Sequence, residues 1–404
     1  MSRLAGHGRE VATGVLAALL LAPGLAFAQV KAPATYDPAF VEQILKRLES
    51  QEKELKELRA AKPPEMPAEE FSKPDVFPKF SFHGFGDVNY VWDNDKGGRR
   101  DSFALGQLDF FVTSQLAENL SVLSEVVIEA NEENNFGIEV ERLLLQWRPS
   151  QYFNADLGRY HTAVGYYSTA YHHGTWLQTA TGRPFFLDFE DGGGLIPAHN
   201  VGVSVNGRIP SGQLGLSYIA EVGNGRPFHD PASGRNPVLN ISDNNGYKAF
   251  NLALVARPEA VPGLQAGAGV YFDRLTPDAQ PRTDELMVHA HAVYQSGPWE
   301  FLSEGYFIQH SPRGGKTTTT PAFFTQLAHK FGAFTPYARF SYVDAAEDDA
   351  VWKLIGSNGL SYGPGVGLRW DFSTLAAFKV QYDFRKRHDL SDLSTLTLQA
   401  CFTF

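Results

Sequence analysis

Residues 162–200 read TAVGYYSTAYHHGTWLQTATGRPFFLDFEDGGGLIPAHN and interrupt an otherwise regular pattern. This stretch of roughly 40 residues has no sustained alternation of apolar and polar side chains, and loops of that length are usually functional or disordered. Its many aromatic residues argue against disorder. On both sides the chain falls into short alternating segments joined by turns. We therefore expect a long loop that folds into the lumen of a barrel built by those segments.

The alternating segments run from Phe80 to the C-terminus. In 366–372 and 378–384, for example, every second residue is apolar, which places the apolar side chains on one face of a strand. The connections between segments alternate between short turns and longer loops. The segments number about 16, an even count as in bacterial outer-membrane barrels. The segment 299–310 has large apolar residues on both faces, so the sequence does not orient it.

These patterns predict an all-β fold, a transmembrane antiparallel β-barrel of about 16 strands over residues 80–404. Residues 162–200 follow the fifth strand and form the third long loop, folded inward. A soluble β-sandwich is the alternative, but it would need a second sheet to cover each apolar face. In a membrane barrel, the lipid bilayer covers the apolar faces.

The region before the barrel has three parts. Residues 1–28 have the basic start, apolar centre and Ala26-Phe27-Ala28 ending of an export signal, although a short membrane anchor has some of the same features. Residues 36–61 carry a heptad seam, which predicts a short parallel coiled coil between subunits or a single amphipathic helix docked on its own chain. Residues 62–79 are rich in proline and form a stiff linker.

Charge and cysteine content exclude several classes of function. The chain has a net charge of −10, and the excess of acids lies in residues 80–404. A basic footprint for nucleic acid is therefore missing. Cys401 is the single cysteine, so no intrachain disulfide can form.

The chain ends in Phe404 after an alternating apolar strand, and residues 157–165 read LGRYHTAVG before the long loop. Together with the heptad seam, these features resemble the DcaP-like porins and, more distantly, the phosphate-selective porins. The resemblance implies a trimeric outer-membrane porin with a periplasmic coiled coil. Phosphate-selective porins have many Arg and Lys residues at the constriction, whereas 162–200 contains only Arg183, so a phosphate filter is not implied here.

The long loop supplies the candidate constriction residues. Charged side chains at the narrowest point of a pore set its ion selectivity. The acidic turn from Asp188 to Gly194 is the best filter candidate, and a solvated surface loop is the alternative. We expect the constriction to contain Arg183, Asp188, Glu190, Asp191, Tyr166, His172 and Trp176. Bases on the polar faces of the last strands would stand opposite, namely Arg339, Arg369, Lys379 and Arg385.

Single features of the sequence suggest two other kinds of site. His172 and His173, with His161 nearby, could bind a metal, but no carboxylate or cysteine completes a site at ligand spacing in the sequence, so we expect no metal or other cofactor. Asp284, His289, His291 and Ser303 could belong to a hydrolase, but a Gly-x-Ser-x-Gly motif is missing from the sequence. We expect that the protein is not an enzyme.

The sequence thus predicts a bacterial outer-membrane porin that lets small hydrophilic solutes or ions diffuse passively, with a weak preference for cations. Its partners would be outer-membrane lipid and two further copies of the chain in a homotrimer, with no nucleic acid. The alternatives are a structural protein whose coiled coil tethers the outer membrane, and a membrane-embedded hydrolase.

Overall fold

The structure is a computed structural model that describes residues 46, 53, 78–95, 101–130, 135–172, 174–189, 192–229, 241–278 and 280–404. The predicted export signal and proline-rich linker lie outside this set, except for Pro78 and Lys79. The predicted coiled coil also lies outside it, except for Lys46 and Lys53, which are both helical. No helix in the described part of the chain is long and apolar enough to cross a membrane.

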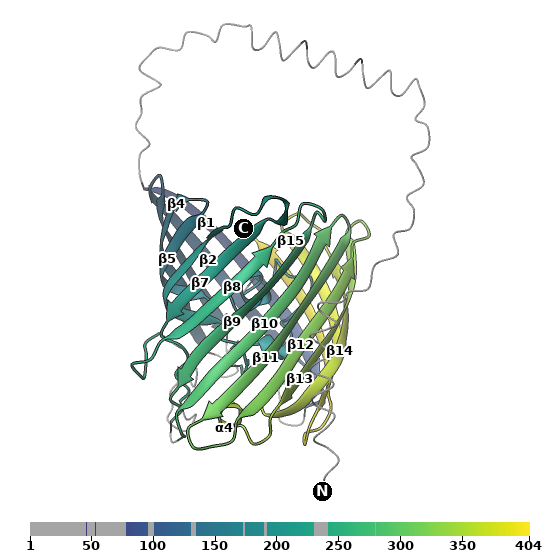
Figure 1. Ribbon diagram of the computed structural model, residues 1–404. Helices are drawn as coiled ribbons and strands as arrows, with labels where there is room; N and C mark the ends of the chain where they lie inside the picture. The colour runs from purple at the N-terminus through teal and green to yellow at the C-terminus, as the bar shows by residue number, and fades with distance from the viewer. Residues whose placement is uncertain are drawn as a thin grey trace. The chain divides into compact units, whose positions relative to one another are not determined.

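The described chain from Pro78 onward forms one closed antiparallel barrel of 16 strands, each paired with its neighbours in sequence (Figure 1). This confirms the fold and the strand number predicted from the alternation. The first eight strands are β1 (Lys79–Asp93), β2 (Ser102–Ala117), β3 (Leu120–Ala130), β4 (Phe136–Ser150), β5 (Phe153–His161), β6 (His199–Arg208), β7 (Leu216–Gly223) and β8 (Ala249–Ala256). The last eight are β9 (Leu264–Leu275), β10 (Thr283–Ser296), β11 (Trp299–Pro312), β12 (Thr318–His329), β13 (Phe334–Ala345), β14 (Gly359–Trp370), β15 (Ala376–Arg387) and β16 (Leu393–Thr403).

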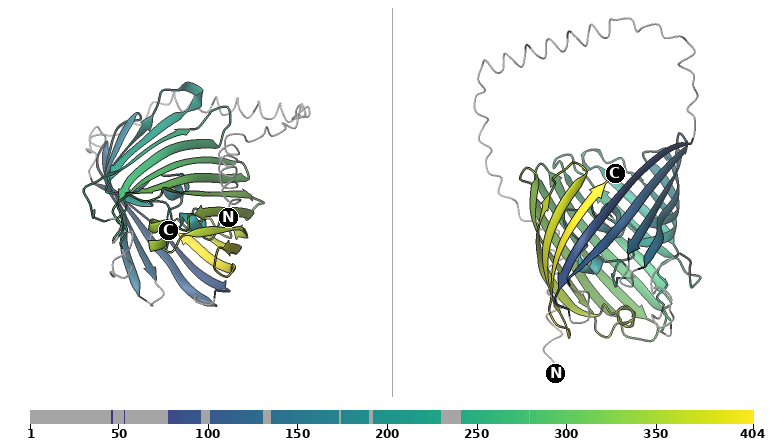
Figure 2. Two further views of the ribbon diagram at one scale, coloured as in Figure 1. Left: turned by 60° about the horizontal axis from the view of Figure 1, so that its bottom comes forward. Right: turned by 180° about the vertical axis from the view of Figure 1, so that it is seen from behind.

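The barrel closes between its first and last strands, which lie side by side in Figure 2. The register runs from Phe85 opposite Thr403 to Asp93 opposite Thr395. Beyond it, Gly84 and Phe404 exchange two backbone hydrogen bonds of 2.9 and 3.0 Å. Gly84 is needed here because a Cβ atom at that position would lie 2.4 Å from the Phe404 ring. The terminal phenylalanine therefore helps to close the barrel.

The outer surface of the barrel is apolar. On β8, Phe250, Leu252 and Leu254 are all more than half exposed, whereas Asn251 and Ala253 between them are buried. Alternation of this kind is what a strand needs when one face meets lipid and the other meets the lumen. The described strands therefore have the outer surface of a membrane-spanning barrel.

The apolar core lies inside the barrel, between the long loop and the walls of β8 to β13. Val164, Tyr167, Phe186 and Leu195 of the loop are buried against inward-facing residues of those strands. This packing explains why 299–310 could not be oriented from the sequence. On β11 the side chains of Leu302, Tyr306 and Ile308 face inward and touch the loop, while Phe301 and Phe307 face outward.

Four short helical segments complete the described fold. Helices α3 (Tyr167–Ala170) and η1 (Phe185–Leu187) lie within the long loop, and α4 (Ala350–Leu354) lies between β13 and β14. A single turn, η2 (Gly212–Leu214), lies between β6 and β7. The Asp349 side chain caps α4 by accepting hydrogen bonds from Val351 N and Trp352 N.

The two faces of β16 respond differently to charge. Replacing the outward-facing Leu398 with Asp should reduce the assembled barrel, since a charge on the lipid face costs about 2–4 kcal/mol near the bilayer midplane. The matched control is Thr397→Asp, because Thr397 is the neighbouring residue and lines the lumen. The measurement is the fraction of heat-modifiable, folded protein in outer-membrane extracts. Equal assembly of the two variants would contradict this orientation of β16.

Candidate functional site

The long loop is fastened to the inner wall soon after it leaves β5. Glu304 of β11 accepts hydrogen bonds from Tyr167 N at 2.7 Å and from Tyr166 N at 3.1 Å. His289 Nδ1 of β10 accepts one from Gly165 N at 3.1 Å. These bonds satisfy backbone N–H groups that would otherwise be buried without a partner. They hold the start of the loop against the wall opposite β5.

Further along, basic side chains of the wall bind carbonyl oxygens of the loop. Arg369 on β14, Lys379 on β15 and Arg339 on β13 are the three donors. Arg369 Nη1 donates to Trp176 O (2.7 Å) and Gln178 O (2.9 Å), Lys379 Nζ to Ala180 O (3.0 Å) and Thr175 O, and Arg339 Nη1 to Gly182 O (2.7 Å). The loop therefore spans the lumen from the β10–β11 side to the β13–β15 side.

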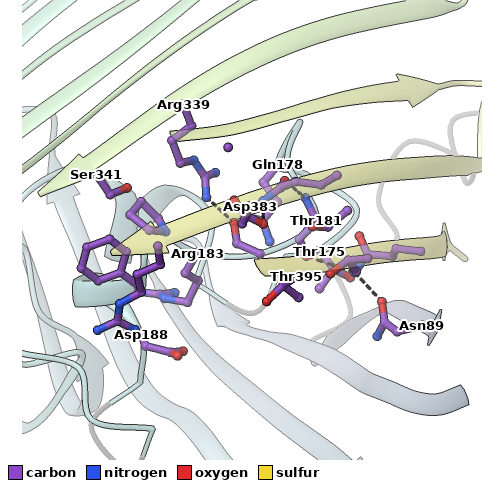
Figure 3. Close-up of a pocket in the computed structure, with 18 of the residues that line it drawn as sticks. Asn89, Thr175, Gln178, Thr181, Arg183, Asp188, Arg339, Ser341, Asp383 and Thr395 are labelled. Carbon is purple, nitrogen blue, oxygen red and sulfur yellow. Dashed lines mark hydrogen bonds between the residues drawn. The ribbon is translucent and has the colours of Figure 1, made fainter. Parts of the chain in front are cut away.

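A cavity of about 550 Å³, lined by both polar and apolar side chains, remains between the loop and the opposite wall (Figure 3). The wall of β13 to β16 together with β1 and β2 forms one side of it, and residues 172–189 of the loop form the other. Six charged side chains line it, three of each sign: Arg183, Arg339, Arg385, Asp87, Asp188 and Asp383. Most of the remaining polar lining is Thr, Ser, Asn and Gln, including Asn89, Thr181, Ser341 and Gln399.

The arginines of the cavity are held in place by stacking as well as by hydrogen bonds. The Arg385 guanidinium carbon lies 4.1 Å from the centre of the Phe185 ring, and that of Arg183 lies 4.5 Å from the Phe189 ring. Arg385 Nε and Arg339 Nη2 are buried with no hydrogen-bond acceptor among the described residues. Both arginines line the cavity, so their positive charges act on a solute within it.

The acids of the cavity are more fully engaged. Asp87 accepts hydrogen bonds from Asn89 Nδ2 (2.5 Å), Gln107 N (3.0 Å) and Gln399 Nε2 (3.2 Å). Asp383 accepts one from Gln381 Nε2 at 2.7 Å. Asp188 is exposed, and its carboxylate interacts electrostatically with Arg385 across the cavity. Loop and wall thus present charges of opposite sign to each other at this point.

Of the loop residues predicted to form a constriction, Arg183, Asp188 and His172 line this cavity. Tyr166 lines a different cavity, beside the turn 257–265. Trp176 packs against the Arg369 guanidinium, with 4.8 Å from the guanidinium carbon to the ring centre. Glu190 and Asp191 lie outside the residues that the structure describes.

Of the four wall bases named from the sequence, Arg339 and Arg385 line the cavity. Arg369 and Lys379 instead bind loop carbonyls, and Lys379 is fully buried. The sequence did not indicate that Glu304 holds the loop or that Asp383 lines the cavity, and it suggested His289 only as a possible hydrolase residue. Their signal was present as polar residues on the inward face of alternating strands, but that face contains many such residues.

The residues of the alternative hydrolase reading do not converge. Asp284 forms a half-exposed ion pair with Arg274, with 2.6 Å between Oδ1 and Nε. His289 is on the inward face of β10, where it binds the loop. Ser303 is on the outward face of β11 and donates to Phe324 O at 3.1 Å. A nucleophile, a base and an orienting acid need hydrogen-bond contact with one another, which these three residues lack.

Among the described residues, one set of side chains could hold a metal ion. Glu141, His161, His172 and His199 are all buried, and their candidate ligand atoms lie within 4.8 Å of one another. The sequence analysis expected no metal site because no carboxylate stands at ligand spacing. In the fold, Glu141 of β4 supplies a carboxylate from a different strand.

No family model and no curated protein matches the sequence. Several solved structures share the fold. The anion-selective porin from Comamonas acidovorans is 12% identical with a TM-score of 0.58, covering 81% of this chain and 100% of its own. Salmonella typhi OmpF in complex with daunomycin is 13% identical with a TM-score of 0.56, covering 81% and 98%.

A third similar structure is the trimer form of Vibrio cholerae OmpT, which is 12% identical with a TM-score of 0.55 and covers 81% of this chain and 100% of its own. At these identities the likeness is one of fold. The chain folds as a 16-strand barrel of the outer-membrane porin type.

The anchoring role of Lys379 can be tested directly. Replacing it with Met leaves the half-buried carbonyl of Thr175 and the buried carbonyl of Ala180 without their donor, at a cost of about 1–3 kcal/mol. Backbone amides of residues 174–182 should then exchange with deuterium roughly 10 to 100 times faster in the folded protein. Lys386→Met, at an exposed position of the same strand, is the control and should change nothing. Unchanged exchange in Lys379→Met would contradict the anchor.

Proposed function

We propose that this protein is an outer-membrane channel through which small hydrophilic solutes or ions diffuse passively, and that the long loop 162–200 sets what passes. The observation that carries the proposal is the loop itself. It crosses the lumen of a closed barrel, is fastened on two sides by Glu304 and Lys379, and leaves a charged, polar cavity beside it.

The cavity is suited to polar solutes. Its volume of about 550 Å³ lies within the range of small-molecule sites, which is roughly 300–1,000 Å³. Charges of both signs and amide and hydroxyl groups can replace part of the hydration of a passing solute. A purely structural tether would have no need for such a lining, and the hydrolase alternative lacks an assembled triad. We therefore propose a channel and not an enzyme.

Selectivity should depend on the balance of charges in the cavity and not on the net charge of the chain. Three arginines and three aspartates line the described cavity, and two arginines retain an N–H group without a protein acceptor. Glu190 and Asp191, which follow Phe189, would add negative charge if they also face the lumen. We propose that their contribution makes the channel weakly cation-selective, as the sequence suggests.

The basic test of the channel is conductance. The purified full-length protein should produce stepwise conductance in planar bilayers and should admit small sugars into liposomes in a swelling assay. A barrel that inserts fully but gives neither signal would overturn the proposal and favour the structural alternative.

The two signs of charge in the cavity can be separated by mutation. Arg385→Gln should raise the cation-to-anion permeability ratio and Asp188→Asn should lower it, each by about twofold, because a unit charge about 8 Å from an ion in water contributes about 0.5 kcal/mol. The measurement is the reversal potential across a salt gradient. Asp389→Asn, whose side chain is 85% exposed, is the control. Identical reversal potentials in all four proteins would show that this cavity is not the filter.

We also propose that the chain is a homotrimer in the bacterial outer membrane, with the helix of residues 36–61 in the periplasm. The heptad seam, the resemblance to DcaP-like porins and the trimer form of one similar structure support this assembly.

Deleting residues 36–61 should lower the temperature at which the trimer dissociates in detergent, while the monomer band still shows a folded barrel. Semi-native gels over a temperature series measure both quantities. A deletion variant with unchanged trimer stability would argue against the coiled coil but not against the channel.

A further inference from the structure

Four buried side chains meet where the long loop joins the barrel. His161 ends β5, His199 begins β6, Glu141 lies on β4 and His172 lies in the loop just after α3. We propose that these four residues bind one transition-metal ion, with Zn²⁺ as the best match, and that the ion ties the long loop to its own base.

The backbone brings the first two ligands together. His161 and His199 are directly opposite each other in the β5–β6 ladder, so their side chains share a face. The chain between them is the long loop. Gly158, with a φ of 136°, interrupts the alternation of β5, and a Cβ atom there would lie 1.9 Å from Leu143 O. Both His161 and the preceding Tyr160 are buried.

A β-bulge directs the carboxylate toward the histidines. Glu125 of β3 pairs with Arg142 and its neighbour Val126 pairs with Val140, so Glu141 is the extra residue of β4. A bulge of this kind re-aims a side chain that regular pairing would place elsewhere. Glu141 is 1% exposed, and Arg142 beside it contacts the buried Glu125. Two consecutive side chains thus turn toward the interior.

The three imidazole rings are closely packed. The ring centres of His161 and His172 are 3.4 Å apart and stacked, and His199 lies edge-on to both, at 5.5 Å from His161 and 4.5 Å from His172. The Nε2 atoms of His172 and His199 both approach the same oxygen, Oε2 of Glu141, the former at 3.2 Å. Two ring nitrogens and one carboxylate oxygen therefore point at a common centre.

The backbone fixes the tautomer of His172. Its Nδ1 lies 3.2 Å from Ser168 O, and a carbonyl oxygen can only accept, so Nδ1 carries a proton. In the neutral ring Nε2 then presents a lone pair to the lone pairs of Glu141. A cation between them turns this repulsion into two bonds. A hydrogen bond from the second ring nitrogen to a carbonyl is also the usual way in which proteins orient a metal-binding histidine.

The surrounding charges allow a cation to bind. Glu125 and Glu141 on the wall lie in the same region as Arg142 and Arg159 on the wall and Arg183 in the loop. The acids are the groups that touch the imidazoles, since Glu125 Oε2 lies 3.4 Å from His161 Nε2 and Glu141 contacts the other two rings.

The set of donors indicates the metal. Three imidazoles and one carboxylate suit Zn²⁺, which prefers four ligands in a tetrahedron, and the neighbouring ions Cu²⁺ and Ni²⁺ less well by geometry. Metal–ligand distances of about 2 Å require ligand atoms about 3.4 Å apart. The ligand atoms in the structure lie up to 4.8 Å apart, so the most distant pair must approach by roughly 1.5 Å when the ion binds. With all four positions filled by protein, the ion would be structural.

The experiment uses the full-length protein, purified in detergent and freed of metal with a chelator. Isothermal titration with Zn²⁺ should show one ion per chain. Glu141→Gln, His172→Ala and His199→Gln should each weaken binding by at least about tenfold. His388→Gln is the matched control, because His388 is a partly exposed histidine that also contacts carboxylates, Glu347 and Asp389. Equal binding in the control and all three variants would overturn the site.

A second readout does not depend on the variants folding. Co²⁺ in a four-coordinate site of the unmodified protein should give strong visible absorption, which Zn²⁺ should abolish by displacement. Zn²⁺ should also slow deuterium exchange at residues 168–172. A wild-type protein that shows neither Zn²⁺ binding nor the Co²⁺ bands would mean that the four residues form only a network of protonated histidines and acids.

Discussion

The pairing of β1 with β16 is the constraint on which the rest of the structure depends. In a bilayer no water is present to satisfy an exposed strand edge, so the sheet must close on itself. Closure sets an inside and an outside, and every strand must then place apolar residues outward. A loop that enters the lumen is shielded from lipid by the wall. Its backbone groups can therefore be satisfied by polar side chains such as Glu304 and Lys379.

The interior of this barrel has two parts, an apolar core and a cavity. Along β8 to β13 the inner wall is largely apolar, because the loop packs there and forms a core with it. Along β13 to β16 and β1 to β2 the inner wall is polar and borders the cavity. One face of the loop thus packs in the apolar core, and its other face lines the cavity. Because hydrogen bonds hold the loop on both sides, they fix the width of the cavity.

Sequence periodicity was sufficient for the strands, their number and the position of the long loop. Periodicity did not orient β11, because it relies on one face of a strand being apolar and the other polar. The inward face of β11 is also apolar, since Leu302 and Ile308 belong to the core that the loop forms with the wall. Periodicity also could not separate Arg369 from Arg385, since both lie on inward faces and differ only in whether a loop carbonyl is within reach. The Glu141–His161–His172–His199 cluster depends on a bulge and a loop contact, and neither leaves a spacing in the sequence.

Charge in such a barrel has two roles that composition cannot distinguish. A guanidinium or ammonium group that donates hydrogen bonds to loop carbonyls, as Lys379 does, holds the loop backbone in place. One whose side chain lines the cavity, as in Arg385, still acts on a passing solute. The net charge of −10 adds both kinds together with exposed rims, whereas the described cavity is balanced at three acids and three bases. Selectivity therefore depends on which charged side chains of the wall do not bind loop carbonyls. A substitution that changes how the loop is held would alter the selectivity even if every residue that lines the cavity stayed the same.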